Sequence, residues 1–350
     1  MSVTSDPIAS AQRPYLTFLL PCYNEAAVMP ETYRRIKAVA EALRKDYEIV
    51  LVNDGSSDDT LAQLLNFAQG DQAVVVVNLS RNHGHQLALC AGLHYCAGER
   101  VLIMDADLQD PPELLPQMLT LLDQGADVVY ARRRTRPGDE PLKRTACAIF
   151  YRLLNRLSDR PIPLDTGDFR LISRRVLEVI LQMPERHRFL RGMVSWVGFQ
   201  QVPFLYDRDK RFAGETKYPF GRLLHLALDG IAASSTRPLA LASYAGMLFA
   251  AASLMLIVYA LYSWWKVGQT PQGWTSLMIV ITVMGSVQLF VLGIIGQYLG
   301  RVHEQTQGRP LFIVDRVFRF SNQNKAGQSS DSPAQNSSEK IETIPASKIH

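Results

Sequence analysis

Two long uncharged apolar runs near the C-terminal end constrain this chain more than any other feature. They extend from Leu239 to Trp265 and from Thr275 to Gly300. As a helix, each run is long enough to cross a hydrocarbon core of about 30 Å. We therefore expect a two-span transmembrane hairpin over residues 238–303, preceded by a domain that works at a membrane without crossing it.

Basic residues around the two runs predict how the hairpin is oriented. Lysines and arginines cluster before the first run and after the second, whereas the connecting loop holds only Lys266. The positive-inside rule then places both flanks in the cytoplasm. Residues 1–14 are polar and small and do not resemble a signal peptide, so we expect a flexible N-terminus and insertion through the C-terminal spans.

Composition excludes some classes of function. The formal net charge of +4 is too small for a typical nucleic-acid-binding protein, so no nucleic-acid partner is expected. The four cysteines show neither a Cys-x-x-Cys pair nor a metal-binding spacing, which favours reduced thiols in a cytosolic compartment.

Short apolar runs alternate with amphipathic stretches through the first 130 residues. The runs predicted as strands are Leu16–Leu20, Ile49–Val52, Val74–Leu79, Val101–Met104 and Val128–Ala131. The stretches predicted as helices are Ala26–Lys45, Asp59–Gln69, Gln86–Ala97 and Pro112–Gln124. This alternation predicts an α/β fold with a Rossmann-like, mostly parallel sheet covered on both faces.

The remainder of the chain divides into several parts. Two helical patterns between Lys143 and Met183 flank a turn that ends in Asp168-Phe169-Arg170, and residues 186–218 predict no regular element. We expect a globular domain over 15–219 and an interfacial amphipathic helix over 220–237. Residues 304–350 are expected to form a cytoplasmic tail, largely disordered after 320 because large apolar residues are scarce there.

Polar motifs follow the predicted strands, where ligands bind in open α/β sheets. After the second strand comes Asp54-Gly55-Ser56, which suits contact with a base or ribose but also suits a turn and a helix cap. Neither a G-x-G-x-x-G fingerprint after the first strand nor a P-loop occurs, which disfavours dinucleotide redox chemistry and P-loop chemistry.

The fourth predicted strand ends in two neighbouring carboxylates, Asp105 and Asp107. Mg²⁺ and Mn²⁺ favour one or two carboxylates together with phosphate oxygens, and Gln109 offers a further oxygen. The alternative is that Asp107 or Asp110 caps the next helix, and both roles can hold at once. His83 and His85 follow the third strand, and because the pattern holds no third ligand, a loop or a helix start is favoured over a metal site.

Taken together, these motifs resemble family 2 glycosyltransferases of the polyprenyl-phosphate type, the group of dolichyl-phosphate mannose synthase and the bactoprenol glucosyltransferases. The resemblance runs in order over about residues 15–300. The motifs that carry it are Pro21-Cys22-Tyr23-Asn24-Glu25, Asn53-Asp54-Gly55-Ser56-Ser57-Asp58, Arg81-Asn82-His83-Gly84, Asp105-Ala106-Asp107-Leu108-Gln109-Asp110-Pro111-Pro112-Glu113, Asp165-Thr166-Gly167-Asp168-Phe169-Arg170 and Arg211-Phe212-Ala213-Gly214-Glu215-Thr216-Lys217-Tyr218.

The resemblance implies a glycosyltransferase A-type fold and a role for each motif. It places Asp105, Asp107 and Gln109 around Mg²⁺ or Mn²⁺, and Asp168 and Arg211 in catalysis. The residues implied to bind the nucleotide sugar are Pro21, Tyr23, Asn24, Glu25, Asp54, Ser56, Asp105, Ala106 and Lys217. Glu215-Thr216 departs from the serine that relatives more often carry before the lysine, which leaves the local loop geometry open.

Asp168 has two alternative roles in this scheme. It is expected to orient the acceptor phosphate or take its residual proton, because a phosphate monoester with a second pKa near about 6 needs little deprotonation. The structural alternative is a helix cap ahead of Leu171–Ile180.

The resemblance implies an enzyme of the bacterial inner (plasma) membrane, multi-pass, with a cytoplasmic catalytic domain. Its expected reaction is the inverting transfer of a hexose, most simply glucose from UDP-glucose, to undecaprenyl phosphate, giving a lipid-linked sugar for the cell envelope and its lipopolysaccharide. GDP-mannose and a UDP-aminoarabinose derivative remain open as donors. Gly296 and Gly300 have the small-xxx-small spacing that serves either a homo-oligomer or packing within the hairpin.

The sequence supports two alternative functions less well than transfer of a single sugar to a lipid phosphate. A processive polysaccharide synthase should carry Gln-x-x-Arg-Trp after the acceptor aspartate, and Arg188-Phe189-Leu190-Arg191 does not supply it. A non-catalytic sugar-nucleotide sensor would tolerate the loss of Asp168, which is present.

Overall fold

The computed structural model describes residues 13–134, 166–186, 188–207 and 273–320, with separate helical residues between 244 and 266. The expected interfacial helix over 220–237, and with it Arg211 and Lys217, lies outside the described residues. The chain divides into two compact units. One is built around a sheet, and the other contains a long helix, α10 (Trp274–Thr306).

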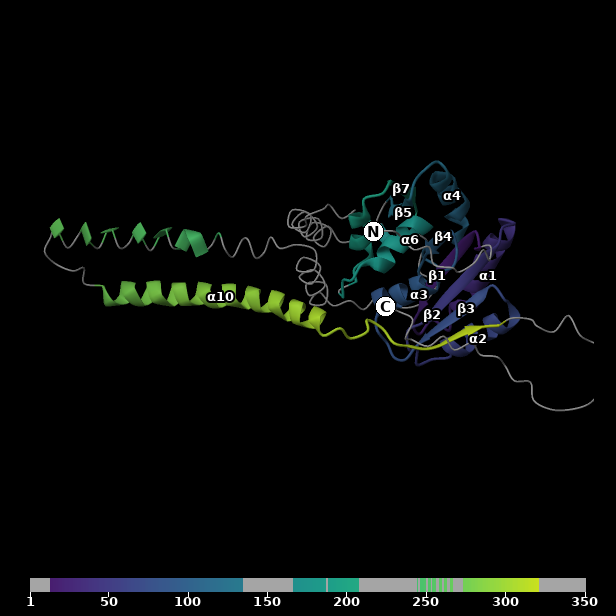
Figure 1. The fold of residues 1–350 in the computed structure, drawn as a ribbon, viewed down its shortest axis with the longest axis horizontal. Helices are drawn as coiled ribbons and strands as arrows, with labels where there is room; N and C mark the ends of the chain where they lie inside the picture. The colour runs from purple at the N-terminus through teal and green to yellow at the C-terminus, as the bar shows by residue number, and fades with distance from the viewer. Residues whose placement is uncertain are drawn as a thin grey trace, which may run out of the picture. The chain divides into compact units, whose positions relative to one another are not determined.

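Strands of the described residues form an eight-stranded sheet in the order β7-β5-β6-β4-β1-β2-β3-β8. Figure 1 labels β1 to β5 and β7 of this sheet. Its strands are β1 (Leu16–Cys22), β2 (Tyr47–Asn53), β3 (Val74–Leu79), β4 (Arg100–Ile103), β5 (Val128–Arg133), β6 (Thr166–Ser173), β7 (Gln201–Tyr206) and β8 (Val314–Arg319). β6 and β8 pair antiparallel with their neighbours, while the other described pairings are parallel. The predicted mixed α/β architecture with a mostly parallel sheet is confirmed.

Helices cover both faces of this sheet. They are α1 (Met29–Ala42), α2 (Thr60–Gly70), α3 (His85–Tyr95), the 3-10 turn η1 (Pro112–Leu114), α4 (Leu115–Asp123), α6 (Arg174–Gln182) and α7 (Leu190–Val197). Every strand and helix predicted before residue 130 is present, with ends displaced by a few residues. These elements were predictable because their apolar periodicity is local to each segment.

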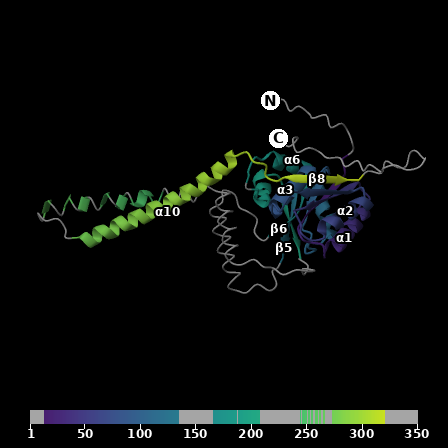
Figure 2. The same ribbon diagram turned by 90° about the horizontal axis from the view of Figure 1, so that it is seen from below.

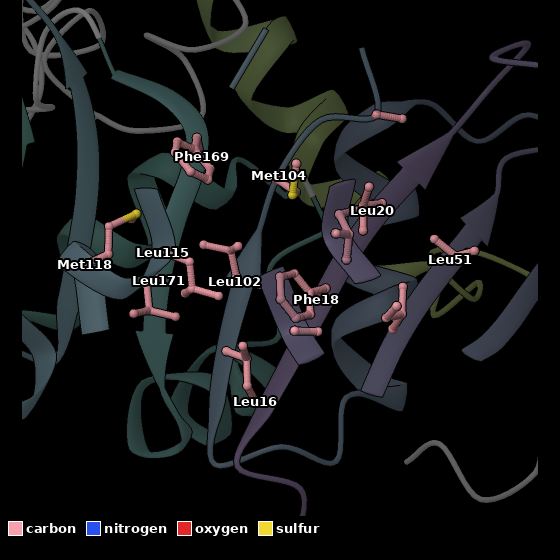
Figure 3. Close-up of a cluster of buried hydrophobic side chains, with 14 of the residues drawn as sticks. Leu16, Phe18, Leu20, Leu51, Leu102, Met104, Leu115, Met118, Phe169 and Leu171 are labelled. Atoms are coloured by element: carbon pink, nitrogen blue, oxygen red, sulfur yellow. The ribbon is translucent and has the colours of Figure 1, made fainter. Parts of the chain in front are cut away.

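Alternate residues of β1 fill two separate cores. Phe18 and Leu20 belong to the cluster shown in Figure 3, which packs under α1, α2 and α4. Leu19 points to the opposite face and packs with residues of α3, α6 and α7. All three side chains are fully buried. The central strand is therefore apolar on both faces, as a sheet between two helical layers requires.

Gly92 lets α3 approach this sheet closely. A Cβ atom at Gly92 would lie 2.2 Å from Leu19 Cδ1 and 2.7 Å from Val52 Cγ2. We expect Gly92→Ala to lower the free energy of unfolding by about 1–3 kcal/mol, because the extra methyl group overpacks the core. Thermal unfolding of the detergent-solubilised protein measures this change.

Gly70→Ala is the matched control for that measurement. Gly70 ends α2, and a Cβ there would meet nothing within 4 Å. Its replacement should leave stability unchanged or slightly raised, since alanine orders a helix at a lower entropic cost. Equal unfolding midpoints for the two variants would contradict the close packing of α3.

Three segments differ from the sequence-based expectation. Asp168 lies in strand β6 rather than in a turn before a helix, and α6 begins only at Arg174. The segment after Arg186, for which no regular element was predicted, holds α7 and β7. The tail contains β8, which pairs with β3 at one edge of the sheet. It is the yellow strand labelled in Figure 2.

α10 is the helix that matches the second apolar run. It has 33 residues, and its portion Val283–Thr306 is long and apolar enough to cross a membrane. Leu289 and Phe290 are 73% and 70% exposed, as lipid-facing side chains would be. Among the described residues this is the one helix long and apolar enough to cross a membrane. The run Leu239–Trp265 is described only in part.

Candidate functional site

The loops after β1 and β2 are joined by hydrogen bonds between the first two motifs. The Asn24 amide donates to Ser56 Oγ at 3.1 Å, and the Ser57 amide donates to Asn24 Oδ1 at 2.8 Å. Asn24 has a φ of +55°, a conformation that asparagine tolerates better than most residues. The structure thus brings these predicted nucleotide-binding residues together at the carboxyl end of the sheet.

The other residues of the first motif flank this junction. Pro21 lies within β1 and pairs with Val52, so it sits in the sheet itself. Tyr23 follows the strand and is 48% exposed, which leaves a ring face available to a ligand. The Glu25 amide donates to Thr60 Oγ1 at 2.9 Å and so ties the loop to the start of α2.

Asp54 organises the loop that follows β3. Its carboxylate accepts hydrogen bonds from the amides of His83 at 2.7 Å and Gly84 at 2.9 Å. Burial raises the pKa of Asp54, although these two hydrogen bonds act in the opposite direction. Gly84 has a φ of +92°, which glycine adopts without strain. Asp54 therefore fixes where α3 begins, at His85.

The loop after β4 is held by hydrogen bonds within the loop and from α1 and β7. Thr32 Oγ1 donates to the carbonyl of Ala106 at 2.8 Å, and the Gln109 amide donates to Asp107 Oδ1 at 3.1 Å. The Tyr206 hydroxyl donates to Asp110. The N-cap residue of η1 is Pro111, whose side chain makes no capping hydrogen bond. The loop also holds Leu108 at a φ of +59°, an unfavourable conformation for leucine.

Asp105 is suited to a divalent cation. Its Oδ1 is buried and has no hydrogen-bond partner in the part of the chain that the structure describes. Burial raises the pKa of Asp105 to about 6, and the neighbouring carboxylates of Asp168, Asp110 and Asp107 act in the same direction, while His85, whose Nε2 lies 3.5 Å from Oδ1, acts against them. A cation beside Asp105 would remove both penalties.

The donor set for such a cation is small. Among the described residues, no group of three or more His, Cys, Asp and Glu side chains is arranged to hold a metal ion. Two carboxylates, Asp105 and Asp107, with the side-chain oxygen of Gln109 still fit Mg²⁺ or Mn²⁺, because these ions take further ligands from water and substrate phosphates.

Asp168 lies at the centre of a hydrogen-bonded cluster. Its side chain is 3% exposed. Arg191 holds it in a bidentate pair, with Nε 2.8 Å from Oδ1 and Nη2 3.1 Å from Oδ2. His85 Nε2 lies 3.0 Å from Oδ2, and Gln86 Nε2 donates to the same oxygen at 3.3 Å.

This cluster keeps Asp168 ionised. Burial opposes its ionisation, but hydrogen bonds from His85 and Arg191 and the charges of Arg191 and Arg170 hold its pKa well below the usual range. Burial also lowers the pKa of His85, yet the carboxylates of Asp168 and Asp105 outweigh it, so that the pKa of His85 is raised. Asp168 is thus a poor proton acceptor and a strong anchor for cationic side chains.

His85, Gln86 and Arg191 are the site residues that sequence reasoning missed. His85 Nε2 lies 3.5 Å from Asp105 as well as 3.0 Å from Asp168, so it connects the two aspartates. The signal for His85 and Gln86 was their place at the end of the polar motif that follows the third strand, where α3 begins. Arg191 carried no local signal, because 23 residues separate it from Asp168. Arg211 and Lys217 lie outside the described residues.

Comparison with known proteins agrees with the motifs. Residues 17–181 match the model of Glycosyl transferase family 2. The chain is 42% identical to the uncharacterized glycosyltransferase YkcC of Bacillus subtilis over 87% of this chain and 95% of the relative. It is 37% identical to the bactoprenol glucosyl transferase of Shigella phage SfII, over 87% and 98% of the two chains.

A weaker likeness relates the chain to a solved structure, glucosyl-3-phosphoglycerate synthase of Mycobacterium tuberculosis in complex with Mn²⁺, UDP and phosphoglyceric acid. The sequences are 21% identical, the TM-score is 0.47, and the match covers 64% of this chain and 78% of the other. The curated relatives are the stronger finding, because each is at least 37% identical and the match covers 87% of this chain. The chain therefore belongs to glycosyltransferase family 2, in the group of the polyprenyl-phosphate type, and is a glycosyltransferase.

Proposed function

We propose that this enzyme transfers glucose from UDP-glucose to undecaprenyl phosphate at the cytoplasmic face of the bacterial inner membrane, with inversion at the anomeric carbon. The observation that carries the proposal is the position of His85, which contacts both Asp105 and Asp168. This position would bring the proposed cation-binding aspartate and the proposed acceptor aspartate into one site. Bactoprenol glucosyl transferases that match over nearly their whole length support the lipid acceptor.

The donor side of the site consists of the first two motifs and the loop after β4. Asp105, Asp107 and Gln109 would hold Mg²⁺ or Mn²⁺, which neutralises the charge that develops on the departing diphosphate. Asn24, Ser56 and Tyr23 would contact the nucleotide. The further donor-side residues of this proposal are Pro21, Glu25, Asp54 and Ala106, with Arg211 and Lys217 beside the phosphates.

The acceptor side needs little proton chemistry. A phosphate monoester with a second pKa of about 6 is largely ionised at neutral pH and can attack without a strong base. Asp168 is consistent with a reaction that needs no strong base, because hydrogen bonds and neighbouring charges keep it ionised and make it a poor proton acceptor. Its role would be to position the acceptor-binding groups, and a single displacement then inverts the configuration of the sugar.

The pairing of β8 with β3 supports a membrane hairpin. β3 precedes the apolar runs and β8 follows α10, and the two strands are hydrogen-bonded neighbours in one sheet. The chain between them must therefore begin and end on the same side of a bilayer, which requires an even number of crossings. If α10 is one crossing, the run Leu239–Trp265 supplies the other.

Cysteine labelling tests this topology. In a cysteine-free background, a cysteine placed at Gln269 should react with a membrane-impermeant reagent only from the periplasmic side, because it would lie between the two spans. Gln69, an exposed residue of α2, is the control and should react only after the membrane is opened. Labelling of both positions from the same side would contradict the hairpin.

The reaction itself is tested with purified full-length enzyme, undecaprenyl phosphate and a panel of nucleotide sugars. The panel contains UDP-glucose, GDP-mannose and UDP-4-deoxy-4-formamido-arabinose, and mass spectrometry identifies the glycolipid. We expect a single hexose on the lipid phosphate with UDP-glucose. A polymeric product would indicate a processive synthase, and binding without any transfer would indicate a sensor.

A further inference from the structure

We propose that Arg191 binds the phosphate of the lipid acceptor and that Asp168 is the positioning residue that holds its guanidinium in place. This inference rests on the proposed function, because it assigns the acceptor subsite of that reaction. It goes beyond the sequence motifs, which point to Asp168 and not to Arg191.

Exposure determines which members of the cluster a ligand meets. The Asp168 side chain is only 3% exposed, whereas the side chains of Arg191 and His85 are 33% and 43% exposed. Both oxygens of Asp168 already accept hydrogen bonds, Oδ1 from Arg191 and Oδ2 from Arg191 and Gln86. An incoming group would therefore meet the donors Arg191 and His85, an arrangement that suits an anion.

The geometry of the guanidinium allows Arg191 to bind two anions. Asp168 engages the edge formed by Nε and Nη2. Because a guanidinium presents several N–H donors in a rigid fork, one arginine can hold a carboxylate on one edge and a phosphate on another. A phosphate monoester offers the oxygens for such charge-assisted, bidentate hydrogen bonds.

Gln86 fixes the segment that carries Arg191. Its Oε1 accepts the amide hydrogen of Leu190, the first residue of α7, at 3.0 Å, while its Nε2 donates to Asp168. The start of α7 is thereby tied to the start of α3. Arg191 is held both through its main-chain neighbour and through its side chain, as a preorganised binding group requires.

The position of the cluster also suits the acceptor rather than the donor. His85 Nε2 lies 3.0 Å from Asp168, the partner of Arg191, and 3.5 Å from Asp105. His85 therefore lies between Asp168 and the proposed cation site. A phosphate bound at Arg191 would lie next to the donor site without sharing its cation. Two phosphate groups that repel each other would then each have their own positive partner.

Steady-state kinetics test the assignment with full-length enzyme in detergent and a short prenyl phosphate. Arg191→Gln should raise the KM for the acceptor by at least about tenfold, as expected for the loss of a charged hydrogen-bonding partner, and leave the KM for the donor unchanged. Arg191→Lys should recover part of the loss, since it keeps the charge but not the fork.

Arg34→Gln is the matched control. Arg34 forms a bidentate pair with Glu31 at 2.7 and 2.6 Å on the exposed surface of α1, so its replacement breaks the same kind of pair away from the site. It should behave as the wild type. An unchanged acceptor KM in Arg191→Gln, or an equal rise in both KM values, would overturn the assignment.

A binding measurement separates this inference from the proposed reaction. By calorimetry, the wild type should prefer the prenyl phosphate to the matched prenyl alcohol, and Arg191→Gln should lose that preference. Weak competition by inorganic phosphate would indicate that the lipid-linked headgroup is the ligand. If the wild type transfers no sugar but shows this Arg191-dependent preference, the proposed function fails and the acceptor subsite stands. Equal preference in wild type and Arg191→Gln overturns the subsite.

Discussion

Asp105→Asn is expected to lower the rate of glycosyl transfer by about three orders of magnitude while leaving the fold intact. The substitution keeps the shape of the side chain but removes the negative charge proposed to hold the cation. Without a cation, the diphosphate would leave without its main positive partner. Asp107→Ala should have an effect of the same kind, because it removes the second carboxylate.

Asp105→Asn should not lower the stability of the protein, although it lowers its activity. Burial raises the pKa of Asp105 to about 6, so the folded protein at neutral pH contains a carboxylate that its surroundings disfavour. A carboxyl group whose pKa is raised on folding lowers stability progressively as the pH rises from its unfolded pKa through its folded pKa, so the full penalty is present at neutral pH. Asparagine removes this penalty, and we expect an unfolding temperature equal to or above that of the wild type.

Thermal unfolding with added cation provides the decisive measurement. Mn²⁺ should raise the unfolding temperature of the wild type but not of Asp105→Asn, since a ligand stabilises only a protein that binds it. Asp123→Asn is the control, because Asp123 is an exposed partner of Arg100. Full turnover by the wild type in excess chelator would show that the two aspartates do not act through a cation.

The sequence predicted the parallel half of the fold because each element there carries its own periodicity. It did not predict β6, because the pairing partners of that strand lie elsewhere in the chain. Phe169 and Leu171 pack in one core while Ile172 packs in the other, an alternation that a strand produces. In the sequence, these apolar residues run on into the helical pattern of α6. The sequence pattern therefore predicts the end of β6 as part of that helix.

The candidate site likewise contains residues that a local sequence pattern predicts and residues that it does not. Asp105 and Asp107 were predictable because two carboxylates at a strand end form a local pattern. Arg191 was not predictable, because it reaches Asp168 only once the segment after α6 has folded and Gln86 has accepted a hydrogen bond from the start of α7. A buried carboxylate needs partners, so the sequence could have predicted that Asp168 has a cation beside it, but not which one.

Asp168→Asn is expected to reduce the transfer rate by at least about a hundredfold, the range typical of a lost positioning group. The cause would be structural organisation of the acceptor subsite rather than the loss of a base. An amide carries no charge to hold the Arg191 guanidinium, and its NH₂ group would face other donors. Donor affinity should remain unchanged, because the first two motifs are not part of this cluster.

The pH dependence of the rate distinguishes an anchor from a base. Neighbouring cations hold the pKa of Asp168 well below its usual range, so Asp168 stays ionised throughout the range in which the enzyme is assayed. The pH–rate profiles of wild type and Asp168→Asn should therefore run parallel. A profile whose acidic limb disappears in Asp168→Asn would identify Asp168 as the proton acceptor.

The same lowered pKa gives a stability prediction with the opposite sign from that of Asp105. A carboxyl group whose pKa is lowered on folding adds stability above its unfolded pKa, and this contribution is fully present at neutral pH. Asp168→Asn should accordingly lower the unfolding temperature. Stability and activity would then fall together for Asp168 and move apart for Asp105, although the two aspartates share the neighbour His85.

A double-mutant cycle between Asp168 and Arg191 completes the test. If Asp168 acts by holding Arg191, then once either residue is replaced the other has little left to contribute. Asp168→Asn combined with Arg191→Gln should therefore have about the same kcat/KM for the acceptor as the more impaired single variant, as for residues that act as a unit. Losses that multiply in the double variant would mean that the two residues act independently, and the bidentate pair would then be a structural contact only.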